Sequence, residues 1–471
     1  MISTPICDFV QAYASSGVSR FHMPGHKGAE VLPGLSMQAD ITEISGADCL
    51  YTADGIILES ERNASLLFGT GATFYSTEGS SQCIRAMLAL VIRNAAARTK
   101  DRPVILAARN VHRAFLTAAA LLDLEVEWLY PQAEPAGSVC SCPVSAEQVR
   151  RALSDMACPP AAVYLTSPDY LGRIQNIREI AEAAHSYGVP LLVDNAHGAY
   201  LHFLEQPAHP MDLGADICCD SAHKTLPALT GCAYLHISKK AAPVYAAHAR
   251  KALSLFGSTS PSWLLLESLD YTNKVLAGGF RSRLSDCISR VTALKRSFPG
   301  IMDTQPGPAQ LPGEWLMEEP LKITIRASSM ALTGTQLAKR LRTYGIECEY
   351  ADPDDMVLMV SPYNTSGDMD RLEAALRDIL STWSKSAAGP LRILSAAAPA
   401  HPQKTLSIRE AALAPSRKIP AEQAAGQICT DLSLSCPPGI PVVICGEVIT
   451  DEAIRMLKYY GIREIEVLAG T

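Results

Sequence analysis

Lys224 and Asp194 are the two residues whose types and positions first suggest catalysis. Lys224 lies in "DSAHKTLPALTG", and Asp194 directly follows the apolar run "VPLLV". Each residue comes just after a predicted buried strand, and open parallel sheets bind ligands at the carboxyl ends of their strands. Taken singly, Asp194 could cap the next turn and Lys224 could be a surface amine. Together, an amine and a carboxylate at two strand ends point to one shared crevice.

This pair suits a cofactor that combines an electrophilic carbonyl, a basic ring nitrogen and a phosphate. The amine would form an imine, and the carboxylate would hold the ring nitrogen protonated. Opposite charges about 4 Å apart, at an effective dielectric near 20, attract by roughly 4 kcal/mol, or about three pKa units. Pyridoxal phosphate fits this description.

The phosphate of such a cofactor needs hydrogen-bond donors. "STEGSSQCIRAML" places Ser80 and Ser81 at the start of an amphipathic helix, where free backbone N–H groups and the helix dipole favour an anion. A plain serine N-cap explains the same residues equally well. Ser221 and His223, beside the lysine, could add donors. His112, in "ARNVHRAF" after another strand, could stack on the cofactor ring or only cap the next helix.

The elements that would position these residues alternate along the first half of the chain. Short β-branched runs such as "PVILAARN", "AAVYLTSP", "VPLLVDNA" and "ADICCDSA" read as buried strands, separated by helices such as "SSQCIRAMLALVIRNAAA" and "NIREIAEAAHSYG". This pattern predicts a doubly wound α/β domain with a mostly parallel sheet. After about residue 285 the strands and helices form a smaller α+β unit. "KSAAGPLRILSAAAPAHPQK" resembles a linker, and "PPGIPVVICGEVITDEAIRMLKYYGI" predicts a closing strand and helix.

Composition narrows the classes of function. The net charge of -7 and the absence of a dense Lys/Arg run argue against a nucleic-acid partner, and a mildly acidic surface would tolerate a small cationic substrate. No apolar run reaches the 18 or so residues of a membrane span. The 14 cysteines show no disulfide or zinc spacing and no secretory signal precedes them, so we expect reduced thiols, no metal and a cytoplasmic protein.

Six ordered motifs resemble the ornithine/lysine/arginine decarboxylases in their short bacterial form, which are pyridoxal phosphate enzymes of fold type I. They are "FHMPGHKG", "DITEISGADCLYTADGII", "VDNAHGAYLHF", "SAHKTLPALTG", "STSPSWLLLESLD" and "PPGIPVVICGE". The resemblance covers nearly the whole chain. It implies an aspartate aminotransferase-like large domain with smaller α+β C-terminal domains. We expect an N-terminal arm (1–35), a cofactor-binding domain (36–285), a small domain (286–385) and a linker with a C-terminal decarboxylase-type domain (386–471).

The resemblance also implies a role for each matching residue. Lys224 would be the imine-forming lysine, Asp194 the partner of the pyridine nitrogen, and Ala196 and His112 would lie under and over the ring. A homodimer or larger homo-oligomer would place the active sites at the subunit interface, near the segment from His22 to Lys27. The residues expected around the cofactor are Ser80, Ser81, Gln82, His197, Ser221 and His223, with Ser258 and Thr259 reaching a phosphate in the neighbouring subunit.

Four departures from the family pattern concern substrate choice and efficiency. Glu78 stands where relatives often have asparagine, Asn195 replaces an acid, Asp220 replaces a common glutamine, and Gly231 stands where glutamine is frequent. The residues implied to hold the cofactor all match.

The resemblance implies decarboxylation of arginine, lysine or ornithine to the corresponding amine, in polyamine metabolism. Lys224, Asp194, His112 and His223 would carry the chemistry, with Cα protonated by Lys224, His223 or another residue. Two alternatives stay open. Another fold-type I reaction, such as amino transfer or aldol cleavage, would use the same lysine and aspartate, with Arg326 as a candidate clamp for a retained carboxylate. A catalytically silent homologue would instead regulate a true decarboxylase.

Overall fold

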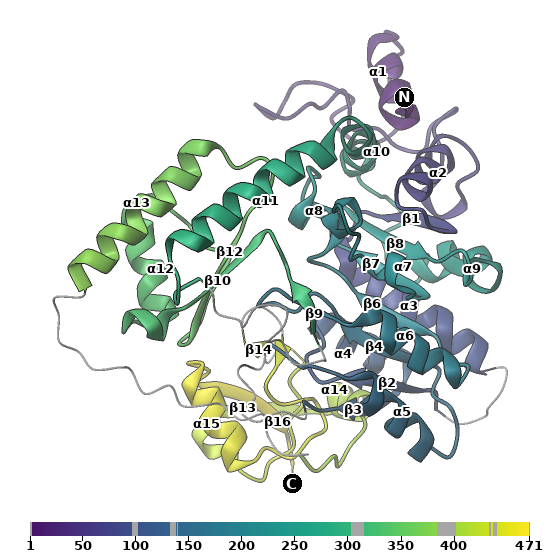
Figure 1. Cartoon of the computed structure of the whole chain (residues 1–471). Coiled ribbons are helices and arrows are strands. Elements are labelled where there is room, and N and C mark those ends of the chain that lie inside the picture. Colours follow the sequence, from purple (N-terminus) through teal and green to yellow (C-terminus); the bar gives the residue numbers. More distant parts are fainter. Residues whose placement is uncertain are drawn as a thin grey trace. The chain divides into compact units, whose positions relative to one another are not determined.

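The computed structural model describes residues 2–96, 102–131, 138, 140–302, 315–383, 402–432, 435–436 and 440–470. Figure 1 labels the helices and strands along the chain. The chain divides into two compact units. The first comprises Met1–Asp101, Pro159–Leu165 and Ile177–Ser282, and the second comprises Arg102–Cys158, Thr166–Asn176 and Arg283–Thr471.

A mostly parallel sheet of seven strands is the main feature of the fold. The strands are hydrogen-bonded in the order β1-β8-β7-β6-β4-β2-β3, and β8 runs antiparallel to both of its neighbours. The pairs β6/β7 and β2/β3 are parallel. The strand bounds are β1 (Ala72–Ser76), β2 (Val104–Ala108), β3 (Glu125–Leu129), β4 (Ala162–Thr166), β6 (Leu191–Asp194), β7 (Ile217–Asp220) and β8 (Ala233–Ile237).

Helices of the first unit pack on this sheet. The amphipathic helix α3 contacts β1, β7, β8 and α9, whereas α6 contacts β6 and α7. The strands between them are almost wholly apolar and buried, as expected for a sheet covered by helices. The elements are α1 (Pro5–Ser15), η1 (Leu50–Thr52), α2 (Ile56–Leu67), α3 (Gly79–Ala96), α6 (Ile177–Ser186), η2 (Ala199–Phe203), α7 (Pro210–Leu213), α8 (Ala222–Thr225), α9 (Ala242–Ser254) and α10 (Trp263–Ala277). Helix α11 (Phe280–Ser297) begins here and continues into the second unit.

The N-terminal helix α1 is held by a buried carboxylate. Asp270 of α10 accepts hydrogen bonds from the backbone N–H groups of Ile6 and Cys7, both at 3.0 Å, and from the hydroxyl of Ser60 at 2.5 Å. The first N–H groups of a helix have no partner within the helix, so a carboxylate at this end satisfies them and complements the helix dipole.

The second unit contains smaller sheets. Strands β10 (Lys322–Arg326), β12 (Asp355–Met359) and β11 (Tyr350–Ala351) form an antiparallel sheet, and three strand pairs join β5 (Arg173–Gln175) to β9 (Trp315–Glu318), β13 (Ser416–Pro420) to β16 (Glu464–Leu468), and β14 (Ser435–Cys436) to β15 (Ile440–Pro441). The helices are α4 (Arg113–Leu122), α5 (Ala146–Asp155), η3 (Ala327–Met330), α12 (Gly334–Thr343), α13 (Ser366–Trp383), α14 (Ile408–Leu413), η4 (Ala421–Gln423) and α15 (Asp451–Tyr459).

The sequence expectations for these elements are largely confirmed, with one correction near the C-terminus. The four buried strands, α3 and α6 form where expected, and so do the strands and helices between residues 322 and 383. The strand expected in "GIPVVICGEV" is wrong beyond Pro441, because the chain turns at Gly446. Gly446 has a φ of +96, and a Cβ at this position would lie 2.3 Å from Leu406 O, so only glycine fits. The chain also continues past α15 into β16.

Two further expectations are not decided by the fold. Residues 385–401 of the predicted linker (385–404) lie outside the described residues. The four-part domain division stays a prediction. Among the described helices, none combines the length and apolar character that crossing a bilayer requires.

Candidate active site

The carboxyl ends of β6 and β7 lie side by side and carry the two residues singled out from the sequence. Asp194 is the last residue of β6 and pairs in register with Cys219 of β7, and the Asn195 N–H donates to Cys219 O at 3.0 Å. Helix α8 follows β7 at once and contains Lys224. The Nζ of Lys224 lies 3.1 Å from Nε2 of His197, which follows β6. The two strand ends therefore bring Lys224 beside the segment that follows Asp194.

Asp194 is buried, with 2% of its surface exposed. Its Oδ1 accepts from the Ala196 N–H at 3.1 Å, and its Oδ2 accepts from the Tyr164 hydroxyl at 3.4 Å. Burial raises the pKa of Asp194, and the positive charge of Lys224 opposes that rise. A buried carboxylate of this kind gains from a second cation, because its own ionised form is costly without one.

The hydroxyls expected at the phosphate also come together. Ser221, the residue before α8, donates to Ser80 Oγ at 2.8 Å, and Ser80 and Ser81 lie in the first turn of α3. The loop before β8 approaches the same helix end, since the Gly79 N–H donates to Gly231 O at 2.8 Å. Gly231 has a φ of +102, which explains why glycine stands at this position.

Gln82 and the segment of Ser258 support this end of α3 in a different way from the one expected. The buried side-chain amide of Gln82 donates to Tyr51 Oη at 2.8 Å and to Leu253 O at 2.9 Å. A direct contact of Gln82 with a phosphate would therefore use its backbone N–H. Ser258 and Thr259 are exposed, and the Ser258 N–H donates to Glu78 of its own chain at 3.3 Å. Their reach into a neighbouring subunit stays a prediction.

The partner of His223 shows which ring nitrogen carries the proton. Its Nδ1 lies 2.9 Å from Cys232 O, and a carbonyl can only accept, so Nδ1 is the protonated nitrogen. Burial lowers the pKa of His223, with a further contribution from the charge of Lys224. The neutral ring thus presents Nε2 as an acceptor, and donation to a phosphate would require the imidazolium.

His112 and Arg326 belong to the second unit. His112 is the N-cap of α4, where its Nδ1 accepts from the Ala114 N–H at 3.2 Å, so the capping role weighed from the sequence is present. Its stacking on a cofactor ring stays a prediction. Arg326, the candidate carboxylate clamp, lies 3.6 Å from Asp355 Oδ1.

Several residues around the site were not anticipated. Tyr164 and Cys219 flank the Asp194 carboxylate, and Asn195, noted only as a departure, donates to Asp220 at 2.6 Å. Tyr164 could have been noticed in the sequence, because it lies in the apolar strand "AVYLT" and a buried hydroxyl needs a hydrogen-bond partner.

These side chains fit pyridoxal phosphate. The primary amine of Lys224 suits its aldehyde, the buried carboxylate of Asp194 suits a protonated ring nitrogen, and the Ser80 and Ser221 hydroxyls at the start of α3 suit a phosphate. Ala196, two residues after Asp194, has a side chain small enough to lie against the cofactor ring.

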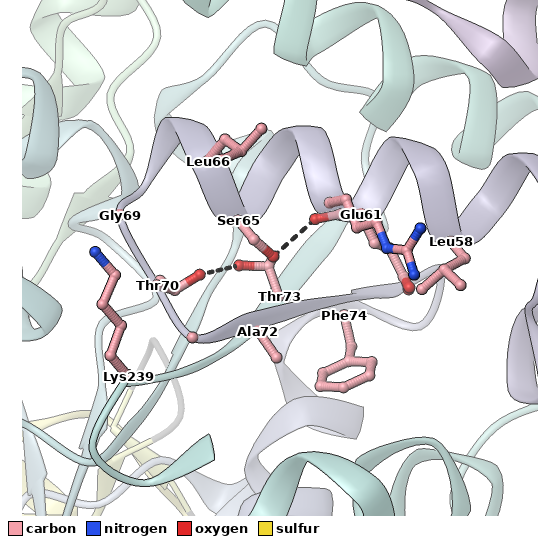
Figure 2. Close-up of a pocket in the computed structure, with 12 residues that line it drawn as sticks. Leu58, Glu61, Ser65, Leu66, Gly69, Thr70, Ala72, Thr73, Phe74 and Lys239 are labelled. Atoms are coloured by element: carbon pink, nitrogen blue, oxygen red, sulfur yellow. Dashed lines mark hydrogen bonds between the residues drawn. The ribbon is translucent and has the colours of Figure 1, made fainter. Parts of the chain in front are cut away.

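A separate cavity of about 520 Å³ lies along α2 and β1 (Figure 2). It is lined mainly by α2, the start of β1 and Lys239, and contains none of the residues expected at the cofactor. The candidate site is therefore defined by the strand ends rather than by this cavity.

Comparison with known proteins gives consistent results along the chain. Residues 4–306 match the model of the Orn/Lys/Arg decarboxylase major domain, and residues 397–465 match that of its C-terminal domain. An arginine decarboxylase of Bacillus subtilis (strain 168) is 30% identical over 96% of this chain and 93% of its own length. An arginine decarboxylase of Bacillus anthracis is 29% identical over 97% of this chain and 92% of its own.

Solved structures agree on the fold. The constitutive lysine decarboxylase of E. coli aligns with a TM-score of 0.78 at 18% identity, covering 99% of this chain and 82% of its own. Lysine decarboxylase A of Pseudomonas aeruginosa aligns with a TM-score of 0.81 at 16% identity, covering 98% and 80%. The expected fold-type I architecture is thereby confirmed.

Proposed function

The chain belongs to the Orn/Lys/Arg decarboxylase family and is a lyase that uses pyridoxal phosphate, and from this premise we propose that it decarboxylates a basic amino acid. Arginine is the first candidate, because the curated relatives that match nearly end to end carry that name. The observation that carries the proposal is the meeting of Lys224 Nζ and His197 Nε2, 3.1 Å apart, at the strand end that bears Asp194.

Pyridoxal phosphate, when bound, supplies an aldehyde that condenses with amines and a ring that accepts the electrons released as the Cα–carboxylate bond breaks. Asp194 would hold a proton on the ring nitrogen, and its hydrogen bonds with the Ala196 N–H and the Tyr164 hydroxyl fix the orientation of its carboxylate. Ser80 and Ser221, whose hydroxyls contact each other, would hold the phosphate. These residues would hold the two ends of the cofactor, and Lys224 would supply the amine that binds its aldehyde.

Lys224 provides the amine that binds the cofactor and that later exchanges with the amine of the substrate or product. His197 Nε2 can accept a proton from Lys224 Nζ, which leaves that nitrogen with the free electron pair needed for attack. The same pair can return a proton to Cα after carbon dioxide leaves. We propose this pair as the proton source.

We further propose a homo-oligomer with active sites at subunit interfaces, a small cationic substrate, and a place in polyamine metabolism. Support comes from the family of the chain and from the exposed position of Ser258 and Thr259 beside the phosphate end of α3. His112 is proposed to stack on the cofactor ring.

The first experiment measures carbon dioxide and amine released from arginine, lysine and ornithine by the purified protein with added pyridoxal phosphate. We expect release with one of the three and its loss in Lys224→Ala. Lys239→Ala is the matched control, because Lys239 lines the separate cavity (Figure 2). A keto acid product would instead indicate amino transfer. A bound cofactor without turnover of any of the three would favour the silent homologue.

A further inference from the structure

Behind the candidate site lies a fully buried carboxylate with three donors. Asp220, at the end of β7, is 0% exposed. His209 Nε2 lies 3.0 Å from its Oδ2, His236 Nε2 lies 3.2 Å from the same oxygen, and the Asn195 amide donates to its Oδ1 at 2.6 Å. A buried charge is tolerated only with partners of this kind.

The hydrogen-bond partners of the two histidines locate their protons. His209 Nδ1 accepts from the Met211 N–H at 3.2 Å, so its proton lies on Nε2 and is donated to Asp220. His236 Nδ1 lies 2.9 Å from Thr73 Oγ1, which lies 2.8 Å from Thr70 Oγ1 (Figure 2). Burial alone would raise the pKa of Asp220, but His209 and His236 outweigh it and hold that pKa well below its usual range.

The same side chains could be taken for a metal site, because ligand atoms of His209, Cys218 and Asp220 lie within 4.8 Å of one another. Nε2 of His209 would then have to give up the proton that it donates to Asp220. Burial also holds the pKa of Cys218 well above its ordinary value, which disfavours a thiolate ligand. The hydrogen-bond network accounts for the cluster without an ion.

The network joins the two strand ends that carry the chemistry. Asn195 directly follows Asp194, and Asp220 directly precedes Ser221, so the bond between Asn195 and Asp220 fixes the spacing of a ring-nitrogen partner and a phosphate donor. Resting on the proposed function, we propose that Asn195 and Asp220 are positioning residues, which hold β6 and β7 at the separation that the cofactor requires.

Two of the departures from the family pattern are then a single exchange. The resemblance implies an acid at position 195 and a glutamine at position 220, whereas this chain has the amide at 195 and the acid at 220, joined by a hydrogen bond. In this chain the carboxylate stands at position 220, where its second oxygen also accepts from the two histidines. The side-chain oxygen of Asn195 is buried without a hydrogen-bond partner among the described residues, so the amide orientation is dictated by Asp220.

The test uses Asn195→Asp, the double variant Asn195→Asp with Asp220→Asn, and Asp216→Asn as control. Asp216 lies at the opposite end of the same strand pair, where it binds His185 at 2.7 Å and the Leu191 N–H at 2.8 Å. Each protein is measured for Tm without cofactor and, by absorbance titration, for affinity for pyridoxal phosphate.

Asn195→Asp places two carboxylates at hydrogen-bond distance, so we expect cofactor affinity to fall by about tenfold or more. The double variant should recover most of it, because the new amide at position 220 can donate to the new carboxylate at position 195. Its remaining oxygen can still accept from His209 and His236. Asp216→Asn should lower Tm and leave the affinity unchanged.

If Asn195→Asp does not fold, Asn195→Ala removes the bond without adding charge and should still weaken cofactor binding. The proposal is overturned if the variants at position 195 bind cofactor as the unaltered protein does, or if the double variant binds no better than Asn195→Asp. Failure of the unaltered protein to bind pyridoxal phosphate would overturn the proposed function itself, whereas normal binding with unaffected variants would overturn only the positioning role.

Discussion

Replacing Asp194 by asparagine isolates the charge of this carboxylate from its shape. Asparagine keeps the side-chain oxygen that accepts from the Ala196 N–H at 3.1 Å, so the local backbone should be retained. What disappears is the negative charge that we propose lies beside the ring nitrogen. The variant should bind the cofactor and react slowly.

The size of the effect follows from burial. Opposite unit charges about 4 Å apart attract by roughly 4 kcal/mol at an effective dielectric near 20, equivalent to about a thousandfold in rate if fully expressed. Burial raises the pKa of Asp194, so part of this attraction serves to keep the carboxylate ionised. We therefore expect kcat to fall by about a hundredfold, with a smaller change in KM.

The assay is steady-state release of carbon dioxide under saturating cofactor, with Asp212→Asn as control. Asp212 lies in α7 of the same unit, where it binds His202 at 2.8 Å. A kcat for Asp194→Asn equal to that of the control would refute the assignment of Asp194 to the ring nitrogen.

Three more changes test the surroundings of the site. Ser80→Ala should weaken cofactor affinity by about tenfold. The effects of Ser80→Ala and Ser221→Ala on that affinity should be non-additive, because the two hydroxyls contact each other. Additive losses in a cofactor titration would contradict a shared phosphate site. Burial raises the pKa of Glu267 to about 7, so the folded state binds its proton more tightly and stability falls as pH rises from about 4.5 to 7. Glu267→Gln should therefore add about 1 to 2 kcal/mol at pH 8 and little at pH 4, measured by urea denaturation, and an equal gain at both would exclude this cause. Gly257→Ala would place its Cβ 2.0 Å from Gln82 Nε2 and should cost about 1 to 3 kcal/mol in the same assay, where an unchanged midpoint would show that the site can relax.

The strand ends of the site could be predicted because their signals are local. "VPLLVD" and "ADICCD" are short apolar runs ended by a polar residue, and parallel pairing then brings Asp194 and Lys224 to one edge. The start of α3 is equally local, since an apolar periodicity begins just after two serines.

The surroundings of Asp220 could not be predicted in this way. His209 comes from the cap of a four-residue helix and His236 from the antiparallel strand β8, and no spacing in the sequence connects them to a carboxylate. The turn at Gly446 was missed for a similar reason, because "PVVICGEV" has the composition of a strand and the close approach of Leu406 O is a tertiary contact.

The hydrogen bonds between Asp270 and the start of α1 limit how the N-terminal helix can be altered. Deleting the residues up to Ser15 would remove two of the donors to the buried Asp270 carboxylate of α10. The loss of these hydrogen bonds would destabilise the protein by a few kcal/mol. An affinity tag should therefore be separated from Pro5 by a flexible spacer, so that the first turn of α1 keeps its hydrogen bonds to Asp270.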